Sequence, residues 1–174
     1  KYHIRNWPAS ARALPFLAVK KLLHANQHAT KPARMKVIDA AIAIITRPGK
    51  VLICQRKDDD TFGGYWEFPG GKQECGETLH ECLARELREE LAIEVKPVRN
   101  LTPVEHHYPQ TKVRLHPFVC DHHSGEPQLI ECQKAIWIEP RELRDYRFPP
   151  ANDQLIEDII AHLTKEGRST RAEG

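Results

Sequence analysis

The order of apolar and polar positions predicts strands both before and after a first helix, and a second helix at the end. An apolar, β-branched run over residues 36–46 is followed by the turn pair Pro48-Gly49 and a second apolar run over residues 51–55, which predicts a β-hairpin. Residues 58–64 are polar and contain glycine, so we expect a loop there. Three shorter runs predict further strands, near residues 98–107, 113–120 and 135–138.

Two segments carry apolar residues at helical spacing. Over residues 78–92 a leucine recurs every fourth position, which predicts a helix with one apolar face formed by Leu79, Leu83, Leu87 and Leu91. Thr78 and Glu81 have the spacing of a capping box at its start. A second helix is predicted over residues 152–164, followed by a polar tail over residues 166–174 that we expect to be frayed.

The composition is that of a globular protein, but the charge is divided unevenly. The chain has 174 residues, of which 40% are apolar and 29% charged. Residues 1–34 hold seven of the 26 basic side chains and no acidic one, which leaves 19 basic and 24 acidic side chains, a net charge of −5, for residues 35–174. A body of this sign disfavours a stable nucleic-acid partner. Residues 35–174 can bind a polyphosphate only if a cation offsets the repulsion between their net negative charge and the phosphates.

The charge boundary coincides with Met35, the single methionine of the chain. We expect one domain over residues 35–165, preceded over residues 1–34 by a basic extension that has no part in the chemistry. The extension also has the composition of an organellar transit peptide, and its first residues resemble the start of some insertion-element transposases. These alternatives stay open.

The cysteines and the apolar runs predict the compartment. Five cysteines, none of them in a C-x-x-C pair, favour reduced thiols over a disulfide framework or a zinc site. No apolar run is long enough to span a membrane. We therefore expect a cytoplasmic protein without a membrane partner, and we expect it to be a monomer.

A group of carboxylates on the first predicted helix is the main candidate for chemistry. Glu86, Glu89 and Glu90 lie at positions i, i+3 and i+4, so they share one side of the helix. Arg85 and Arg88 flank them, and a solvated charged face is one interpretation. The other is a site for a hard divalent cation such as Mg²⁺ or Mn²⁺, which prefers several oxygen ligands.

The residues before this helix favour the metal site. The segment Trp66-Glu67-Phe68-Pro69-Gly70-Gly71-Lys72 is followed by Glu77 and by Arg85-Glu86-Leu87-Arg88-Glu89-Glu90, at the spacing G-x5-E-x7-R-E-U-x-E-E. This pattern resembles the signature of the Nudix hydrolases, with Ala92 where the family usually has glycine. Further on, Phe148-Pro149-Pro150-Ala151-Asn152 and Gly125-Glu126-Pro127 are similar to segments of its MutT-type members. The likeness covers about residues 35–163.

The resemblance implies a fold and a reaction. The implied fold is α/β, an α/β/α sandwich with a central mixed β-sheet. The implied reaction is the Mg²⁺-dependent hydrolysis of a nucleoside triphosphate, with Mn²⁺ as a substitute metal. We expect 8-oxo-dGTP as the substrate and 8-oxo-dGMP and pyrophosphate as the products.

Two alternatives accompany this expectation. One is a pyrophosphohydrolase of the same fold that acts on (d)CTP or a modified pyrimidine nucleotide. The other is a non-catalytic 8-oxoguanine recognition module, like the C-terminal domain of MutY-type adenine glycosylases. The complete set of carboxylates disfavours the second alternative.

The resemblance also assigns roles to individual residues. It implies that the metal is held by the Gly71 carbonyl, Glu86, Glu89, Glu90 and Glu131, with Glu131 as either a ligand or a proton acceptor. Arg85 would orient Glu86, and Glu77 would support the turn into the helix. Arg56 and Lys72 would contact phosphate or help the nucleotide leave. The base would be contacted by Phe68, Phe148 and Asn152.

Asn152 has two interpretations. As a helix N-cap it would accept a hydrogen bond from the first turn of the second helix. As a base-contacting residue, its amide offers both a donor and an acceptor to a purine edge. Relatives that prefer cytidine tend to have Asp at this position, so Asn favours an oxidised guanine. Bacterial MutT, however, has an arginine where this chain has Thr111 followed by Lys112, which leaves the base preference open.

Overall fold

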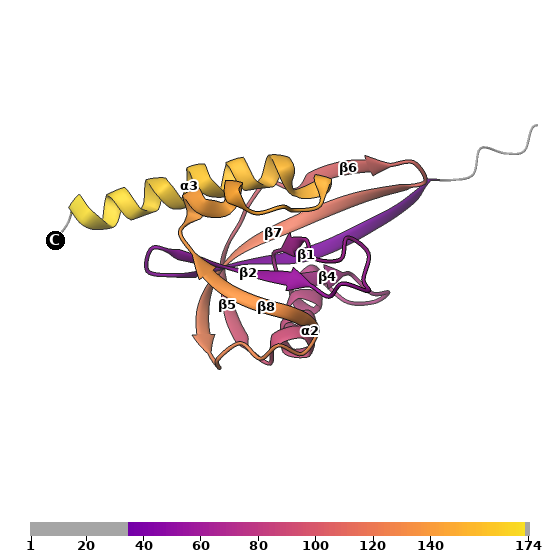
Figure 1. Cartoon of the computed structure of the whole chain (residues 1–174), viewed down its shortest axis with the longest axis horizontal. Helices are drawn as coiled ribbons and strands as arrows, with labels where there is room; N and C mark the ends of the chain where they lie inside the picture. The colour runs from indigo at the N-terminus through magenta and orange to yellow at the C-terminus, as the bar shows by residue number, and fades with distance from the viewer. Residues whose placement is uncertain (1–34, 173–174) are drawn as a thin grey trace, which may run out of the picture. The chain divides into compact units, whose positions relative to one another are not determined.

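The computed structural model describes residues 35–172, so the basic extension over residues 1–34 lies outside the described residues (Figure 1). Strands come first in the chain and the long C-terminal helix comes last. The elements are β1 (Lys36–Arg47), β2 (Lys50–Arg56), β3 (Trp66–Glu67), β4 (Gly70–Lys72), α2 (Leu79–Leu91), β5 (Glu94–Asn100), β6 (Val104–Tyr108), β7 (Thr111–Ser124), β8 (Cys132–Ile138), the 3-10 helices η2 (Pro140–Asp145) and η3 (Pro150–Asn152), and α3 (Asp153–Ala172).

The strands of the described residues form one mixed sheet around β1. β1 runs parallel to β7, with Ile38 opposite Val113, and antiparallel to β2 and β4. The main strand order is β3-β2-β1-β7-β5, and β4, β6 and β8 pair with β1, β7 and β2 respectively. The register with β4 places Gly71 opposite Ala41, which fixes the glycine segment against the central strand.

Two helices cover opposite faces of the sheet and produce the α/β/α sandwich predicted from the sequence (Figure 1). Because side chains alternate along a strand, β1 contributes to two separate cores. On the face covered by α3, Ile42 and Ile44 pack with Leu155 and Ile159. The core on the opposite face contains Ala41, Ala43 and Ile45 of β1 and Cys82, Leu83, Leu87 and Leu91 of α2. Within residues 35–172, no helix is long and apolar enough to cross a membrane.

The termini of α2 follow the predicted capping pattern. The Thr78 hydroxyl accepts a hydrogen bond from the N–H of Glu81 at 3.2 Å, and the Glu81 carboxylate accepts one from the N–H of Thr78 at 2.7 Å. The helix ends at Ala92, which has the left-handed φ of 51° that glycine adopts more easily. A side chain in this conformation costs about 1 kcal/mol, so the departure from the family pattern leaves a small strain at this helix end.

Several predicted boundaries were wrong. The strand predicted over residues 98–107 is two strands, β5 and β6, which both pair with β7. Pro103 lies between them and has no N–H to continue a ladder. The second helix extends to Ala172, well past residue 164. Apolar spacing reveals only the packed turns of a helix, whereas the later residues are polar and include good helix formers.

Candidate active site

The turn from the sheet into α2 brings backbone against a carboxylate. A Cβ at Gly70 would lie 2.2 Å from the carbonyl oxygen of Ala41, and a Cβ at Gly71 would lie 2.4 Å from the carboxyl carbon of Glu86. Gly70 also has a φ of 132° and would meet backbone, so its position requires glycine, whereas a side chain at Gly71 would displace the Glu86 carboxylate. The Gly71 carbonyl oxygen is directed toward α2, 3.5 Å from the Sγ of Cys82. Gly71 and Glu86 are therefore in direct contact.

Arg85 binds three of the carboxylates near the start of α2. Its guanidinium donates to both carboxyl oxygens of Glu77 at 3.1 and 2.7 Å, to Glu86 at 2.9 Å and to Glu89 at 3.1 Å. It also donates to the carbonyl oxygen of Lys72 at 3.3 Å. The bonds from Arg85 lower the pKa of Glu77 to about 2. One arginine therefore joins the loop before the helix to two carboxylates on the helix.

Glu90 lies on the same side of α2 but is directed toward the sheet. Its carboxylate accepts a hydrogen bond from the N–H of Gly70 at 2.9 Å. Burial raises the pKa of Glu90 to about 8, and the negative charges of Glu67, Glu86 and Glu131 add to this rise. These carboxyl groups are therefore close enough to repel one another.

A loop before β8 carries Glu131 to the C-terminal end of α2. The N–H groups of Ile130 and Glu131 both donate to the carbonyl oxygen of Glu90, at 3.2 and 3.4 Å, and the N–H of Gln128 donates to Leu91 at 2.9 Å. The last carbonyls of a helix have no partner within the helix, so this loop completes its end. Burial is the main cause of a raised pKa at Glu86, and the charge of Glu131 contributes to it.

The donor atoms in this region suit a hard divalent cation. Glu86, Glu90 and Glu131 and the Gly71 carbonyl offer only oxygen, which Mg²⁺ and Mn²⁺ prefer. The repulsion among these carboxylates is what a bound cation would relieve. Within residues 35–172, however, no three acidic, imidazole or thiol side chains already lie in a metal-binding arrangement. Arg85 holds both Glu86 and Glu89 in the present side-chain conformations.

The two basic residues expected to contact phosphate have different surroundings. Arg56, at the end of β2, pairs with the carboxylates of Glu67 and Asp60 and donates to the carbonyl oxygen of Thr61 at 2.7 Å. Lys72, at the end of β4, is exposed and borders a groove that Asp39 also lines. The structure therefore places Arg56 beside the buried carboxylates, with its charge already paired.

The residues expected to contact the base lie on the other face of the sheet. The rings of Phe68 and Phe148 are stacked, with centroids 5.2 Å apart, and both belong to the core that α3 covers. Asn152, the last residue of η3, is 8% exposed, and its side-chain amide donates to the carbonyl oxygen of Pro149 at 3.3 Å. The bond joins Asn152 to the residue before η3, and the amide nitrogen that donates it is not the atom that would accept a capping bond from α3.

Glu67 lies beside the predicted site residues, although the sequence assigned no role to it. It belongs to β3, which pairs with β2, and its carboxylate forms an ion pair with Arg56. Burial raises the pKa of Glu67, while Arg56 opposes the rise. The motif over residues 66–72 contains Glu67, but the pairing of two strands is what brings it to Arg56 and Glu90.

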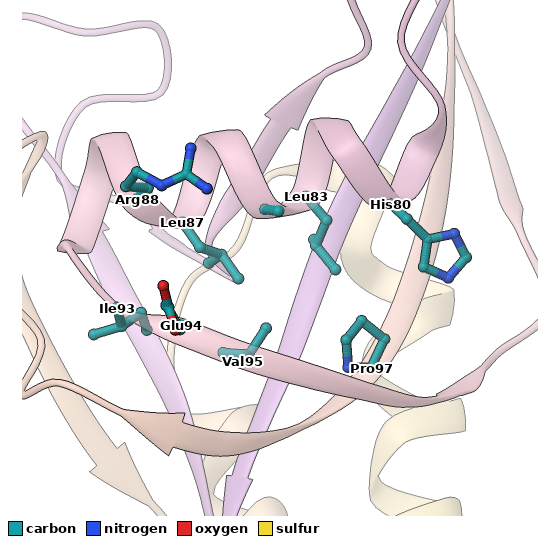
Figure 2. Close-up of a pocket in the computed structure, with 9 residues that line it drawn as sticks. His80, Leu83, Leu87, Arg88, Ile93, Glu94, Val95 and Pro97 are labelled. Carbon is teal, nitrogen blue, oxygen red and sulfur yellow. The ribbon is translucent and has the colours of Figure 1, made fainter.

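A separate cavity of about 300 Å³ lies between α2 and β5 (Figure 2). Leu83 and Leu87 of α2 point into it from one side, and Val95 and Pro97 lie on the other side. None of the predicted metal, phosphate or base residues lines this cavity. The chemistry of the carboxylates is thus separate from the apolar side of α2.

The comparisons with known proteins identify the class of this fold and site. The family model of the NUDIX domain matches residues 40–158, and the chain belongs to the Nudix hydrolase family. The CTP pyrophosphohydrolase of Escherichia coli is 36% identical over 127 residues, which cover 73% of this chain and 94% of the relative. The 8-oxo-dGTP diphosphatase of Haemophilus influenzae is 33% identical over 126 residues, 72% of this chain and 93% of the relative.

The solved structures agree with this result. A structure of MutT from Aliivibrio salmonicida or Vibrio cholerae superposes with a TM-score of 0.63 at 32% identity and covers 73% of this chain and 99% of its own. The family and the fold predicted from the sequence are therefore confirmed.

Proposed function

We propose that this Nudix hydrolase cleaves nucleoside triphosphates to a nucleoside monophosphate and pyrophosphate with Mg²⁺, and that 8-oxo-dGTP is its preferred substrate. The observations that support the reaction are the contact of Gly71 with the Glu86 carboxylate and the hydrogen bond from Gly70 to the Glu90 carboxylate, with the Glu131 loop bonded to the end of the same helix. Relatives named 8-oxo-dGTP diphosphatase and CTP pyrophosphohydrolase support the substrate class.

The metal, when bound, neutralises charge on the phosphates and activates the attacking water. We propose Glu86, Glu89, Glu90, Glu131 and the Gly71 carbonyl as its ligands. Mg²⁺ would serve as the cofactor, and Mn²⁺ would substitute for it.

The side chains around these ligands would hold them in place. Arg85 orients Glu86 and Glu89 by direct hydrogen bonds, and Glu77 fixes Arg85 from the loop. Glu131 comes from a separate loop, and we propose it either as a metal ligand or as the acceptor of a proton from the attacking water. Arg56 and Lys72 would contact the phosphates.

The preference for an oxidised guanine depends on Asn152. Its buried amide and the stacked pair of Phe68 and Phe148 belong to the part of the molecule that α3 covers, and we propose the base site there. An amide presents a donor and an acceptor together, and 8-oxoguanine presents both on one edge. The carboxylate of an aspartate at this position would present acceptors only.

A second candidate substrate is dCTP or a modified pyrimidine triphosphate. The relative named CTP pyrophosphohydrolase, at 36% identity, favours it. In that case the aromatic pair would hold a smaller base, and Asn152 would contact its amino group.

A substrate panel distinguishes the two candidates. Release of pyrophosphate with Mg²⁺ is measured for 8-oxo-dGTP, dGTP, dCTP and 5-methyl-dCTP, for the full chain and for Asn152→Asp. We expect the highest kcat/KM for 8-oxo-dGTP, and a shift of the 8-oxo-dGTP to dCTP ratio by about tenfold toward dCTP in the variant. A wild-type preference for the cytidine nucleotides would contradict the role of Asn152. No turnover of any of the four would contradict the proposed reaction.

A further inference from the structure

A second cavity, of about 400 Å³, adjoins the carboxylate cluster at Glu131. It is lined by Lys57, Asp59, Asp60, Ile130 and Glu131. Its walls come from two loops, one after β2 and one before β8. The cavity shares Glu131 with the proposed metal ligands, and neither Phe68 nor Phe148 lines it.

Lys57 joins the two loops. Its ammonium nitrogen Nζ donates to the carbonyl oxygen of Ile130 at 3.0 Å. Ile130 in turn donates its N–H to the carbonyl oxygen of Glu90. An ammonium has three N–H donors, and the bond to Ile130 uses one of them. The bond fixes the charged end of a long, exposed side chain at the rim of the cavity.

Lys57 is the positively charged residue among those that line the cavity. Asp59, Asp60 and Glu131 are acidic. The charge of Asp60 is paired with Arg56. An anion that enters the cavity beside a metal held at Glu131 would therefore meet one positive side chain, and that side chain is already held in position.

We propose that Lys57 binds the terminal phosphates of the substrate and, after cleavage, the pyrophosphate product. This inference rests on the proposed function and names the residue that would recognise its leaving group. The cavity is lined by charged side chains and one isoleucine, and it contains no ring on which a base could stack. A phosphate chain held by a metal at the carboxylates would have this cavity beside it, at Glu131.

Direct binding of pyrophosphate tests the inference without depending on catalysis. Titration calorimetry with Mg²⁺ and pyrophosphate is performed on the full chain and on Lys57→Met, and the same titration is repeated with a nucleoside monophosphate. We expect the Kd for pyrophosphate to rise about tenfold in the variant, the loss typical of one charge-assisted hydrogen bond, while the Kd for the monophosphate stays unchanged.

Two matched variants separate charge from structure. Lys57→Arg keeps the positive charge and should recover most of the affinity for pyrophosphate. Lys50→Met removes an exposed lysine at the start of β2 and should leave both Kd values unchanged. Thermal unfolding of all three variants is expected to match the wild type, because both lysines are exposed.

Different results would contradict the role of Lys57 and the proposed function. An unchanged Kd for pyrophosphate in Lys57→Met would overturn the inference. An equal rise for pyrophosphate and monophosphate, or a weaker affinity for Mn²⁺ with no change for pyrophosphate, would also overturn it, because Lys57 would then act only by holding the Glu131 loop. If the wild type binds pyrophosphate through Lys57 but hydrolyses no triphosphate, the proposed function fails and the inference stands.

Discussion

The two ends of the candidate site are built in different ways. At the carboxylate end, Glu86, Glu89 and Glu90 belong to one helix, and Arg85 of the same helix binds two of them. At the aromatic end, Phe68 and Phe148 are 80 residues apart and meet only because the sheet and η3 fold together. The first end depends on local spacing, and the second depends on the packing of the core.

This difference separates the groups proposed for catalysis, which lie on one helix, from those proposed for base selectivity, which lie in the core. A helix holds its side chains in a fixed relation that changes little when the core is repacked, so it suits groups that must keep their geometry. The aromatic end consists of core residues, and a substitution there alters the stability of the fold together with the shape of the base site. We therefore expect substitutions at the carboxylate end to affect kcat with little effect on folding, and substitutions at the aromatic end to affect both.

The largest effect is expected from Glu90→Gln. The amide keeps an oxygen that can accept the N–H of Gly70 but removes the charge, so kcat should fall by at least about 10²-fold while KM changes little. Near-normal turnover would contradict the proposed role of Glu90.

The same variant tests the burial of this carboxylate through the pH dependence of unfolding. In the unfolded chain Glu90 ionises near the ordinary value of 4.5, whereas burial raises its pKa to about 8 in the folded protein. Without metal, raising the pH from 5 to 8 therefore favours the unfolded state of the wild type. Glu90→Gln should lose this part of the decline in Tm, and an unchanged decline would show that the carboxylate is well solvated.

Phe148→Ala should have the next largest effect, and it should act on folding as well as on activity. Removal of a buried ring that stacks on Phe68 leaves a cavity, with an expected loss of about 3 kcal/mol in the free energy of unfolding. Urea unfolding measures this loss, and KM for the nucleotide should rise in the same variant. A variant as stable as the wild type and with an unchanged KM would contradict the expectation that substitutions at the aromatic end affect both folding and activity.

The smallest effect is expected from Glu77→Gln, which removes one partner of Arg85. Arg85 lowers the pKa of Glu77 to about 2, so the wild type gains stability from this ionised carboxylate above pH 4.5 and loses it as the pH falls toward 2. The variant should lose less Tm than the wild type between pH 5 and pH 2. Parallel profiles would show that the pair of Glu77 and Arg85 contributes nothing to folding.

The sequence predicted what depends on local spacing. The capping box of Thr78 and Glu81 and the leucine face of α2 both arise from residues near one another in the chain. The separation of β5 from β6 and the pairing of Arg56 with Glu67 depend on which strands become neighbours. Apolar spacing carries no information about such neighbours, so these features required the structure.

The ion pairs of Arg56 have a consequence for how a phosphate would bind. A free guanidinium would gain the full attraction of an arriving anion, but this one already has two carboxylate partners, Glu67 and Asp60. Contact with a phosphate is then an exchange of partners, and its free energy is the difference between two similar interactions. Such an exchange contributes little to the affinity for substrate. It would, however, release Glu67 or Asp60 from Arg56 each time a phosphate binds. The site with substrate and the site without it would therefore differ in which carboxylates carry an unpaired negative charge.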